Sequence, residues 1–164
     1  MRGGIALFEL IVVLAFLMII VSLAVPTFSV FDRLLVRAEL DTLYLTCASL
    51  QQEAQLTGQA KELIFMITQQ AYTWGKERHV LHPSVRFGFI QDVKGPPSSP
   101  QVIIKHPVTF PSDKIVFHPD GIVQAGSVYL IDKASRFLFA LTCPVSRVSY
   151  VRRYIYQESW SPIS

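Results

Sequence analysis

Residues 5–25, a run of 21 residues near the start of the chain with Glu9 as its only charge, constrain the fold most. A helix rises about 1.5 Å per residue, so this run spans about 30 Å, the thickness of a bilayer's hydrocarbon core. The chain has 164 residues, is 51% hydrophobic and has a mean hydropathy of +0.37, which is high for a soluble domain. We therefore expect a transmembrane helix over residues 5–26, followed by one domain.

A cleaved secretory signal is the competing interpretation, because Ser22, Leu23 and Ala24 form a small-x-small pattern. The apolar part of such a signal is usually about 7–15 residues long and uncharged, whereas this run is longer and contains Glu9. A carboxylate in lipid is costly and usually has a partner. Glu9 therefore stays near the wet headgroups, takes up a proton or meets a cation.

Gly4 is followed by Ile5-Ala6-Leu7-Phe8-Glu9 and then by an apolar run that ends at Pro26. This pattern resembles the leader and N-terminal helix of type IV pilins and pseudopilins. In that family, prepilin peptidase cuts after the glycine, the new N-terminus is N-methylated, and a glutamate is fifth in the mature chain. A proline is often twenty-second. Counted from Ile5, Glu9 is fifth and Pro26 is twenty-second; the departures are a short leader, residues 1–4, and Ile5-Ala6 where phenylalanine and threonine are usual.

Residues 117–130 resemble the F-x-P-x-G-x-x-x-x-G-x-x-x-L stretch of the GspH/FimT minor pseudopilins. Arg147-Val148 resembles the late G-R-V turn of that family, with Ser146 in place of the glycine. The resemblance implies a non-catalytic subunit of a periplasmic pseudopilus, either in type II protein secretion or in type IV pilus assembly. It also implies a single-pass protein of the bacterial inner membrane, with its globular domain in the periplasm.

The same resemblance implies partners and roles for single residues. The partners are other pilin or pseudopilin subunits, prepilin peptidase and the inner membrane. Gly4 and Ile5 flank the leader cleavage site, and Ile5 is the methylated residue. Glu9 and Pro26 serve assembly, and Glu9 pairs with the methylated amine of a neighbouring Ile5. In an isolated subunit Glu9 could equally pair with the Ile5 amine of its own chain, because the two residues are one helical turn apart.

After Pro26, residues 27–57 are mostly good helix formers without glycine or proline, and Gly58 follows as a helix-ending glycine. We expect an amphipathic continuation of the first helix, kinked but not ended at Pro26. One face, expected to cover a sheet, has helical spacing and consists of Leu40, Leu43, Cys47, Leu50 and Ala54. A second stripe suits either a wider buried face or packing against neighbouring subunits and consists of Phe31, Leu34, Leu35, Ala38 and Leu45.

Residues 58–164 carry short β-branched and aromatic runs between turn residues, which predicts an antiparallel β-rich domain and an α+β fold for the chain. The expected strands are residues 63–68, 85–90, 102–105, 114–118, 127–131, 137–142 and 147–155. Residues 94–100, rich in proline, glycine and serine, should form a loop, and residues 118–121 a turn.

The side chains that could carry chemistry match no catalytic or metal-binding motif in the sequence. His79 and His82 would face opposite sides of a strand. His82, His106 and His118 each precede a proline, which fits turns better than a metal shell. We expect no enzyme activity, no metal and no cofactor.

Cys47 lies on the sheet-facing stripe and Cys143 at the end of a predicted strand, so the two thiols could meet. A disulfide between them would close a long loop and stabilise the domain by about 4–5 kcal/mol. Two buried thiols are the alternative.

Two other functions stay open. The net charge is +3 and the basic residues are scattered, which disfavours nucleic-acid binding. A pilin-like DNA-binding subunit for DNA uptake would need an exposed patch of Arg147, Arg152 and Arg153. A membrane-anchored periplasmic enzyme would need a pocket with convergent polar groups.

Overall fold

The computed structural model describes residues 3–144 and 151–163, and the side chains of residues 9–20, 30–144 and 151–163. The chain divides into two units, Met1–Leu34 and Leu35–Ser164. Helix α1, Gly3–Thr57, is assigned without a break at Pro26. It ends directly before Gly58, whose φ of 68° is the left-handed conformation that glycine adopts without strain at the end of a helix. The predicted end of the helix is confirmed, whereas the kink at Pro26 stays a prediction.

In the second unit, α1 buries the face that the helical spacing predicted. Its five members Leu40, Leu43, Cys47, Leu50 and Ala54 are all buried, and Val36 extends the face by one turn. Burying a leucine side chain is worth about 1.5–3 kcal/mol, so this stripe is a main reason why the helix stays on the sheets.

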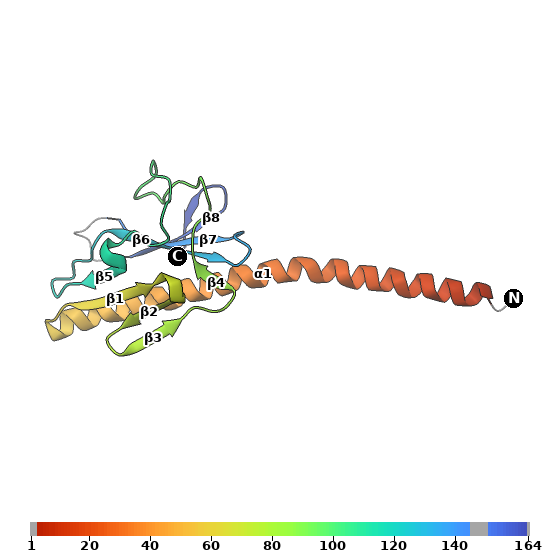
Figure 1. Ribbon diagram of the computed structural model, residues 1–164, viewed down its shortest axis with the longest axis horizontal. Coiled ribbons are helices and arrows are strands. Elements are labelled where there is room, and N and C mark those ends of the chain that lie inside the picture. The colour runs from red at the N-terminus through yellow and green to blue at the C-terminus, as the bar shows by residue number, and fades with distance from the viewer. Residues whose placement is uncertain (1–2, 145–150, 164) are drawn as a thin grey trace. The chain divides into compact units, whose positions relative to one another are not determined.

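Two antiparallel sheets make up the rest of the second unit (Figure 1). Sheet A has the order β3-β2-β1-β5 and consists of β1 (Lys61–Met66), β2 (Ala71–Trp74), β3 (Glu77–Val80) and β5 (Lys114–Phe117). Sheet B has the order β4-β6-β7-β8-β9 and consists of β4 (Val85–Phe87), β6 (Gly126–Asp132), β7 (Leu138–Cys143), β8 (Arg152–Tyr156) and β9 (Trp160–Pro162). The short 3₁₀ helices are η1 (Ile67–Gln69) and η2 (Pro111–Asp113). The predicted antiparallel α+β fold is confirmed.

Sheet B is buried on both faces. Successive side chains of a strand point to opposite faces, and those of β6 divide accordingly. Val128 and Leu130 join the core cluster that includes the buried face of α1 and residues of sheet A. Tyr129 and Ile131 join a second cluster, which includes Val93 and Ile104 from the long segment between β4 and β5. That segment therefore covers the face of sheet B opposite α1.

Some strand predictions were wrong. Residues 102–105 form no strand: Ile103 makes one isolated bridge to Lys94, and Ile104 packs into the second cluster while Val102 stays exposed. The sequence missed β2, β3 and β9. Strand β3 is a polar sheet edge with no apolar alternation to find. The predicted strand 147–155 begins at Arg152 as β8, and its residues 147–150 lie outside the described part of the chain.

The structure explains why glycine occupies two positions of the 117–130 stretch. Gly121 has φ of 83° in the predicted turn, where its N–H donates to the carbonyl of His118 at 2.9 Å. A Cβ at Gly126 would overlap the ring of Phe110. The turn is confirmed. A side chain at Gly121 would be strained by the positive φ, and a side chain at Gly126 would have to displace the ring of Phe110.

Candidate functional site

The described part of the predicted membrane helix presents an apolar surface. Among residues 9–20 of α1, the large apolar side chains from Leu10 to Ile20, other than the half-buried Val12, are between 50% and 75% exposed. Glu9 is exposed at the start of this segment. Where side chains are described, which leaves out residues 1–8 and 21–29, no helix is long and apolar enough to cross a membrane.

Gly4, Ile5 and Pro26 have helical backbones in α1, but their side chains lie outside the described set. Cleavage after Gly4, methylation of Ile5 and the assembly roles of Glu9 and Pro26 therefore stay predictions. The Ser146-Arg147-Val148 turn also lies outside the described residues.

The second stripe of α1 is exposed at four of its five positions. Phe31 and Leu34, in the first unit, are 59% and 56% exposed. In the second unit, Leu45 is 65% exposed and Ala38 is also exposed, whereas Leu35 is half-buried against the core. Of the two readings, packing against neighbours fits the four exposed positions, and a wider buried face fits only Leu35.

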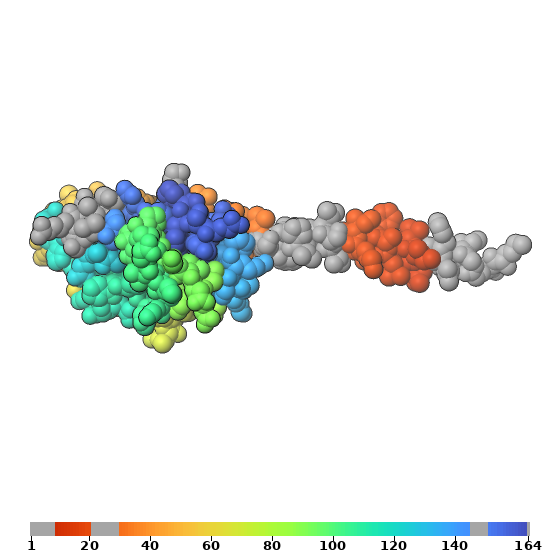
Figure 2. All heavy atoms as spheres, turned by 90° about the horizontal axis from the view of Figure 1, so that it is seen from above, coloured from red at the N-terminus to blue at the C-terminus, as the bar shows by residue number. Residues whose placement is uncertain are grey.

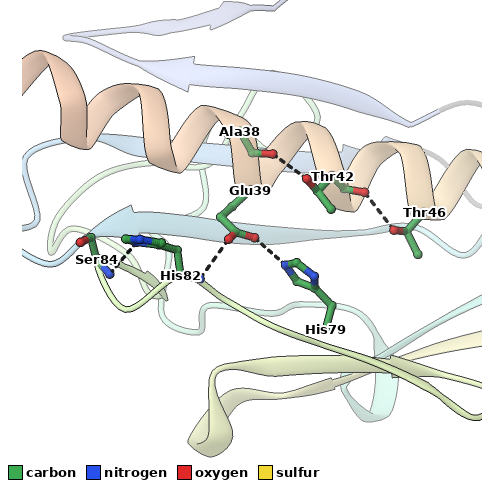
Figure 3. Close-up of polar contacts among 7 residues, drawn as sticks. All are labelled: Ala38, Glu39, Thr42, Thr46, His79, His82 and Ser84. Carbon is green, nitrogen blue, oxygen red and sulfur yellow. Dashed lines mark hydrogen bonds and ion pairs between the residues drawn. The ribbon is translucent and has the colours of Figure 1, made fainter.

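A carboxylate on α1 ties the helix to the β3 strand of sheet A (Figure 3). The two oxygens of Glu39 contact His79 Nε2 at 2.8 Å and accept a hydrogen bond from the backbone N–H of His82 at 2.9 Å. The Glu39 side chain is only 13% exposed. On its other side His79 packs against Tyr72, with the ring centroids 5.0 Å apart. Burial raises the pKa of the Tyr72 hydroxyl, so this group stays neutral.

A second polar contact ties α1 to sheet B. Arg153 of β8 donates a hydrogen bond to Asp41 of α1 at 2.7 Å, and its guanidinium lies 4.4 Å from the centre of the Tyr44 ring. Its side chain is 20% exposed. Arg153 therefore serves the packing of the helix on the sheet.

The arginine patch that a DNA-binding subunit would need finds no support. Arg153 is held by Asp41 and Tyr44, Arg152 is exposed, and Arg147 lies outside the described residues.

The two cysteines come together in the main core cluster as buried thiols. Burial raises the pKa of Cys47 from 9.0 to about 12, and the nearby Cys143 thiol adds to the shift. The Cys143 S–H donates a weak hydrogen bond to the carbonyl of Val123 at 3.7 Å. The predicted meeting of helix and strand occurs, and the disulfide stays a prediction.

The histidines do not converge. His79 contacts Glu39, whereas the His82 ring accepts a hydrogen bond from the backbone of Ser84 at 3.2 Å. His106 is exposed and His118 begins the turn before Gly121. Among the described side chains, no three His, Cys, Asp or Glu residues lie close enough to hold a metal ion.

Sequence reasoning missed the polar residues that join the layers. Glu39 and Asp41 flank Leu40, a member of the buried stripe. An acid at the border of a buried helix face is the sequence signal from which their contacts with the sheets could have been predicted. No signal marks Gln70, whose Oε1 accepts the Phe87 N–H at 2.6 Å and whose carbonyl accepts the Leu81 N–H at 2.9 Å. Its two bonds link η1 to β4 and to the end of β3.

No protein-family model matches the chain, and no curated protein matches it. Among solved structures, the chain is similar to the minor pseudopilin EpsH from the type 2 secretion system of Vibrio cholerae, with a TM-score of 0.51 and 14% sequence identity. The match covers 75% of this chain and 97% of that chain. At this identity the likeness shows the fold: a long N-terminal helix packed on antiparallel sheets, as in a pilin-like pseudopilin.

Proposed function

We propose that this chain is a minor pseudopilin of the GspH/FimT kind, a non-catalytic structural subunit of a pseudopilus. The observation that carries the proposal is a coincidence of two independent features. Gly4, Glu9 and Pro26 have the spacing of the pilin-like N-terminal pattern, and the fold of the same chain is similar to that of a minor pseudopilin over 75% of its length.

In this proposal, prepilin peptidase removes residues 1–4 and the new amine of Ile5 is methylated. Residues 5–26 then hold the subunit in the bacterial inner membrane, with residues 58–164 as a globular domain in the periplasm. The exposed apolar side chains of residues 10–20 suit this placement, because lipid can cover them at no cost in hydrophobic free energy.

The carboxylate of Glu9 favours the transfer of the subunit from the membrane into the filament. On insertion scales an acid costs about 2.5–3.5 kcal/mol in the centre of a bilayer and less near an end of the spanning helix, where Glu9 lies. The amine of a neighbouring Ile5 in a bundle of helices offers Glu9 an opposite charge, which offsets the cost of removing the acid from water. Assembly into the filament then relieves a penalty that the subunit carries in lipid.

The exposed stripe of α1 gives the bundle a second source of stability. Phe31 and Leu34 in the first unit and Leu45 in the second unit expose more than half of their side-chain surface. Burying each against a neighbouring subunit's helix would contribute about 1.5–3 kcal/mol before the entropy of assembly is subtracted.

The proposal is tested by Glu9→Ala and Glu9→Gln in a host that assembles the filament. We expect both variants in the membrane fraction at wild-type levels but absent from sheared filaments, because neither can pair with the Ile5 amine. Glu53→Gln, which changes an exposed acid of α1 in the second unit, is the matched control and should assemble normally. Normal incorporation of Glu9→Gln would contradict the charge-pairing account.

A further inference from the structure

A cavity of about 550 Å³ opens between the segment before β5 and the β8–β9 hairpin. Figure 2 looks onto this face, where residues near 100, in green, adjoin the C-terminal strands, in dark blue. Pro97 and Pro100 line the cavity from the segment, and Tyr156 and Trp160 line it from the hairpin. The cavity lies wholly within the second unit.

The aromatic wall of this cavity is held in place before any ligand arrives. The indole N–H of Trp160 donates to the backbone carbonyl of Lys94 at 2.8 Å. The centroid of the Trp160 ring lies 5.3 Å from that of Tyr156 and 6.2 Å from that of Tyr129, and the Tyr129 residue is 3% exposed. A fixed ring loses little entropy when a ligand stacks on it.

The same cavity is locally acidic. Asp92 and Glu158 line it together with one cation, Lys94, so the acids outnumber the cation in the lining, whereas the whole chain carries a net charge of +3. Neither acid makes a side-chain hydrogen bond or an ion pair with any residue that the structure describes, and both are exposed. Two carboxylates are therefore open to an incoming cation.

The backbone holds these two acids in unusual conformations. Asp92 has φ of 62° and Glu158 has φ of 97°, in the left-handed region that favours glycine and asparagine. A glutamate at such a φ is strained. Glycine would avoid this backbone strain at position 158, where a residue that lines the cavity carries a carboxylate instead.

We propose that this cavity binds the guanidinium of an arginine side chain presented by a partner protein. A planar guanidinium stacks on the face of an indole and reaches two carboxylates at once, which suits a fixed Trp160 beside Asp92 and Glu158. The cavity is lined by residues of the segments 92–100 and 156–160 and shares no residue with α1, so the inference can be tested independently of the proposed function.

The test follows the indole N–H of Trp160 by NMR in the full chain, kept in dodecyl maltoside micelles. The protein has two tryptophans, and Trp74→Phe leaves the Trp160 signal alone in its region. The probe is N-acetyl-arginine methylamide, titrated to about 100 mM because one side chain gives an affinity in the millimolar range. We expect a saturable shift of the Trp160 signal. The citrulline analogue, which has nearly the same shape without the charge, should bind about tenfold more weakly or not at all.

Charge variants sharpen the test. The double variant Asp92→Asn, Glu158→Gln should weaken arginine binding about tenfold, since asparagine tolerates the positive φ of residue 92 and both changes keep the side-chain shape. Lys94→Gln should strengthen binding, because it removes the competing cation and keeps the carbonyl that holds Trp160. Asp113→Asn is the matched control, an exposed acid with φ of 51° away from the cavity, and should leave binding unchanged.

The proposal is overturned if arginine causes no saturable shift of Trp160, or if citrulline binds as tightly as arginine. It is also overturned if the double variant binds as the wild type does. Should the double variant fail to fold, Lys94→Gln and the citrulline comparison decide alone.

Discussion

The thiol of Cys47 shows how burial decides the chemistry of a single residue. Cys47 has no exposed surface and belongs to the core cluster that also holds Cys143. A thiolate there would lose its hydration, so burial raises the pKa of Cys47 to about 12. In the reduced protein this thiol behaves as a small apolar side chain rather than as a nucleophile.

The raised pKa of Cys47 predicts a stability that falls in alkali. Above pH 9 the unfolded chain loses the Cys47 proton, whereas the folded chain keeps it until about pH 12. The stabilising contribution is therefore complete below pH 9 and is lost as the pH rises towards 12. Between pH 7 and pH 10, the free energy of unfolding of the reduced protein should fall by about 1.4 kcal/mol more than that of Cys47→Ala.

Urea unfolding of both proteins in a phosphine reductant measures this difference. The alanine variant carries the same tyrosines and lysines, so their titration cancels in the comparison. Equal losses in the two proteins would show that the thiol ionises as readily in the folded chain as in the unfolded one.

At the scale of elements, the contact between α1 and strand β3 depends on one carboxylate. Glu39 receives the His82 N–H and contacts the His79 ring, and its side chain is 13% exposed. Strand β3 is an edge of sheet A and has no buried residue of its own. Polar contacts therefore hold strand β3 against α1, whereas buried apolar side chains hold strand β1 in place.

Glu39→Ala should lower the free energy of unfolding by about 1–2 kcal/mol, because it leaves the His82 N–H and the His79 ring without their acceptor. Glu39→Gln should cost less, since an amide oxygen can still accept the His82 N–H. Glu53→Ala is the control. It breaks a pair with Lys61 in which the acid is 49% exposed, and such a pair contributes less than about 1 kcal/mol. Denaturant unfolding ranks the three variants, and a Glu53→Ala loss equal to that of Glu39→Ala would contradict the assignment.

The elements differ in how far the sequence predicts them, for physical reasons. Helix α1 and its buried face follow from a spacing that only a helix makes continuous. Strands β6 and β7 were found from their β-branched and aromatic runs, because both faces of sheet B are buried. The prediction missed strand β3 and wrongly assigned a strand to residues 102–105, because strand pairing depends on neighbouring strands that the local sequence does not show. Residues 102–105 pack on a face of sheet B through Ile104 and do not extend the sheet at its edge.

The candidate sites divide in the same way. The N-terminal pattern around Gly4 and Glu9 is linear, so the sequence alone predicts it. The cavity, in contrast, is built from residues that are far apart in the sequence. Asp92 and Trp160 both line it only because the segment before β5 crosses sheet B to the edge at β9. No local signal marks such a meeting.

At the scale of the whole molecule, the two units expose surfaces of different chemistry, which suit different partners. The first unit exposes apolar side chains that suit lipid or other helices. The second unit has its own core, packed on both faces of sheet B, and a locally acidic cavity on its surface. This division is what the proposed function requires of a subunit that lies in a membrane before it is assembled.

The N-terminus of the mature protein tests this account most directly. Mass spectrometry of the N-terminal peptide, from protein isolated from a host with prepilin peptidase, should find a chain that begins at Ile5 with a methylated amine. Cleavage after Gly4 creates the amine that Glu9 is proposed to meet, so the whole assembly account depends on it. A chain that begins at Val25 would instead be the product of a secretory signal and would contradict the account.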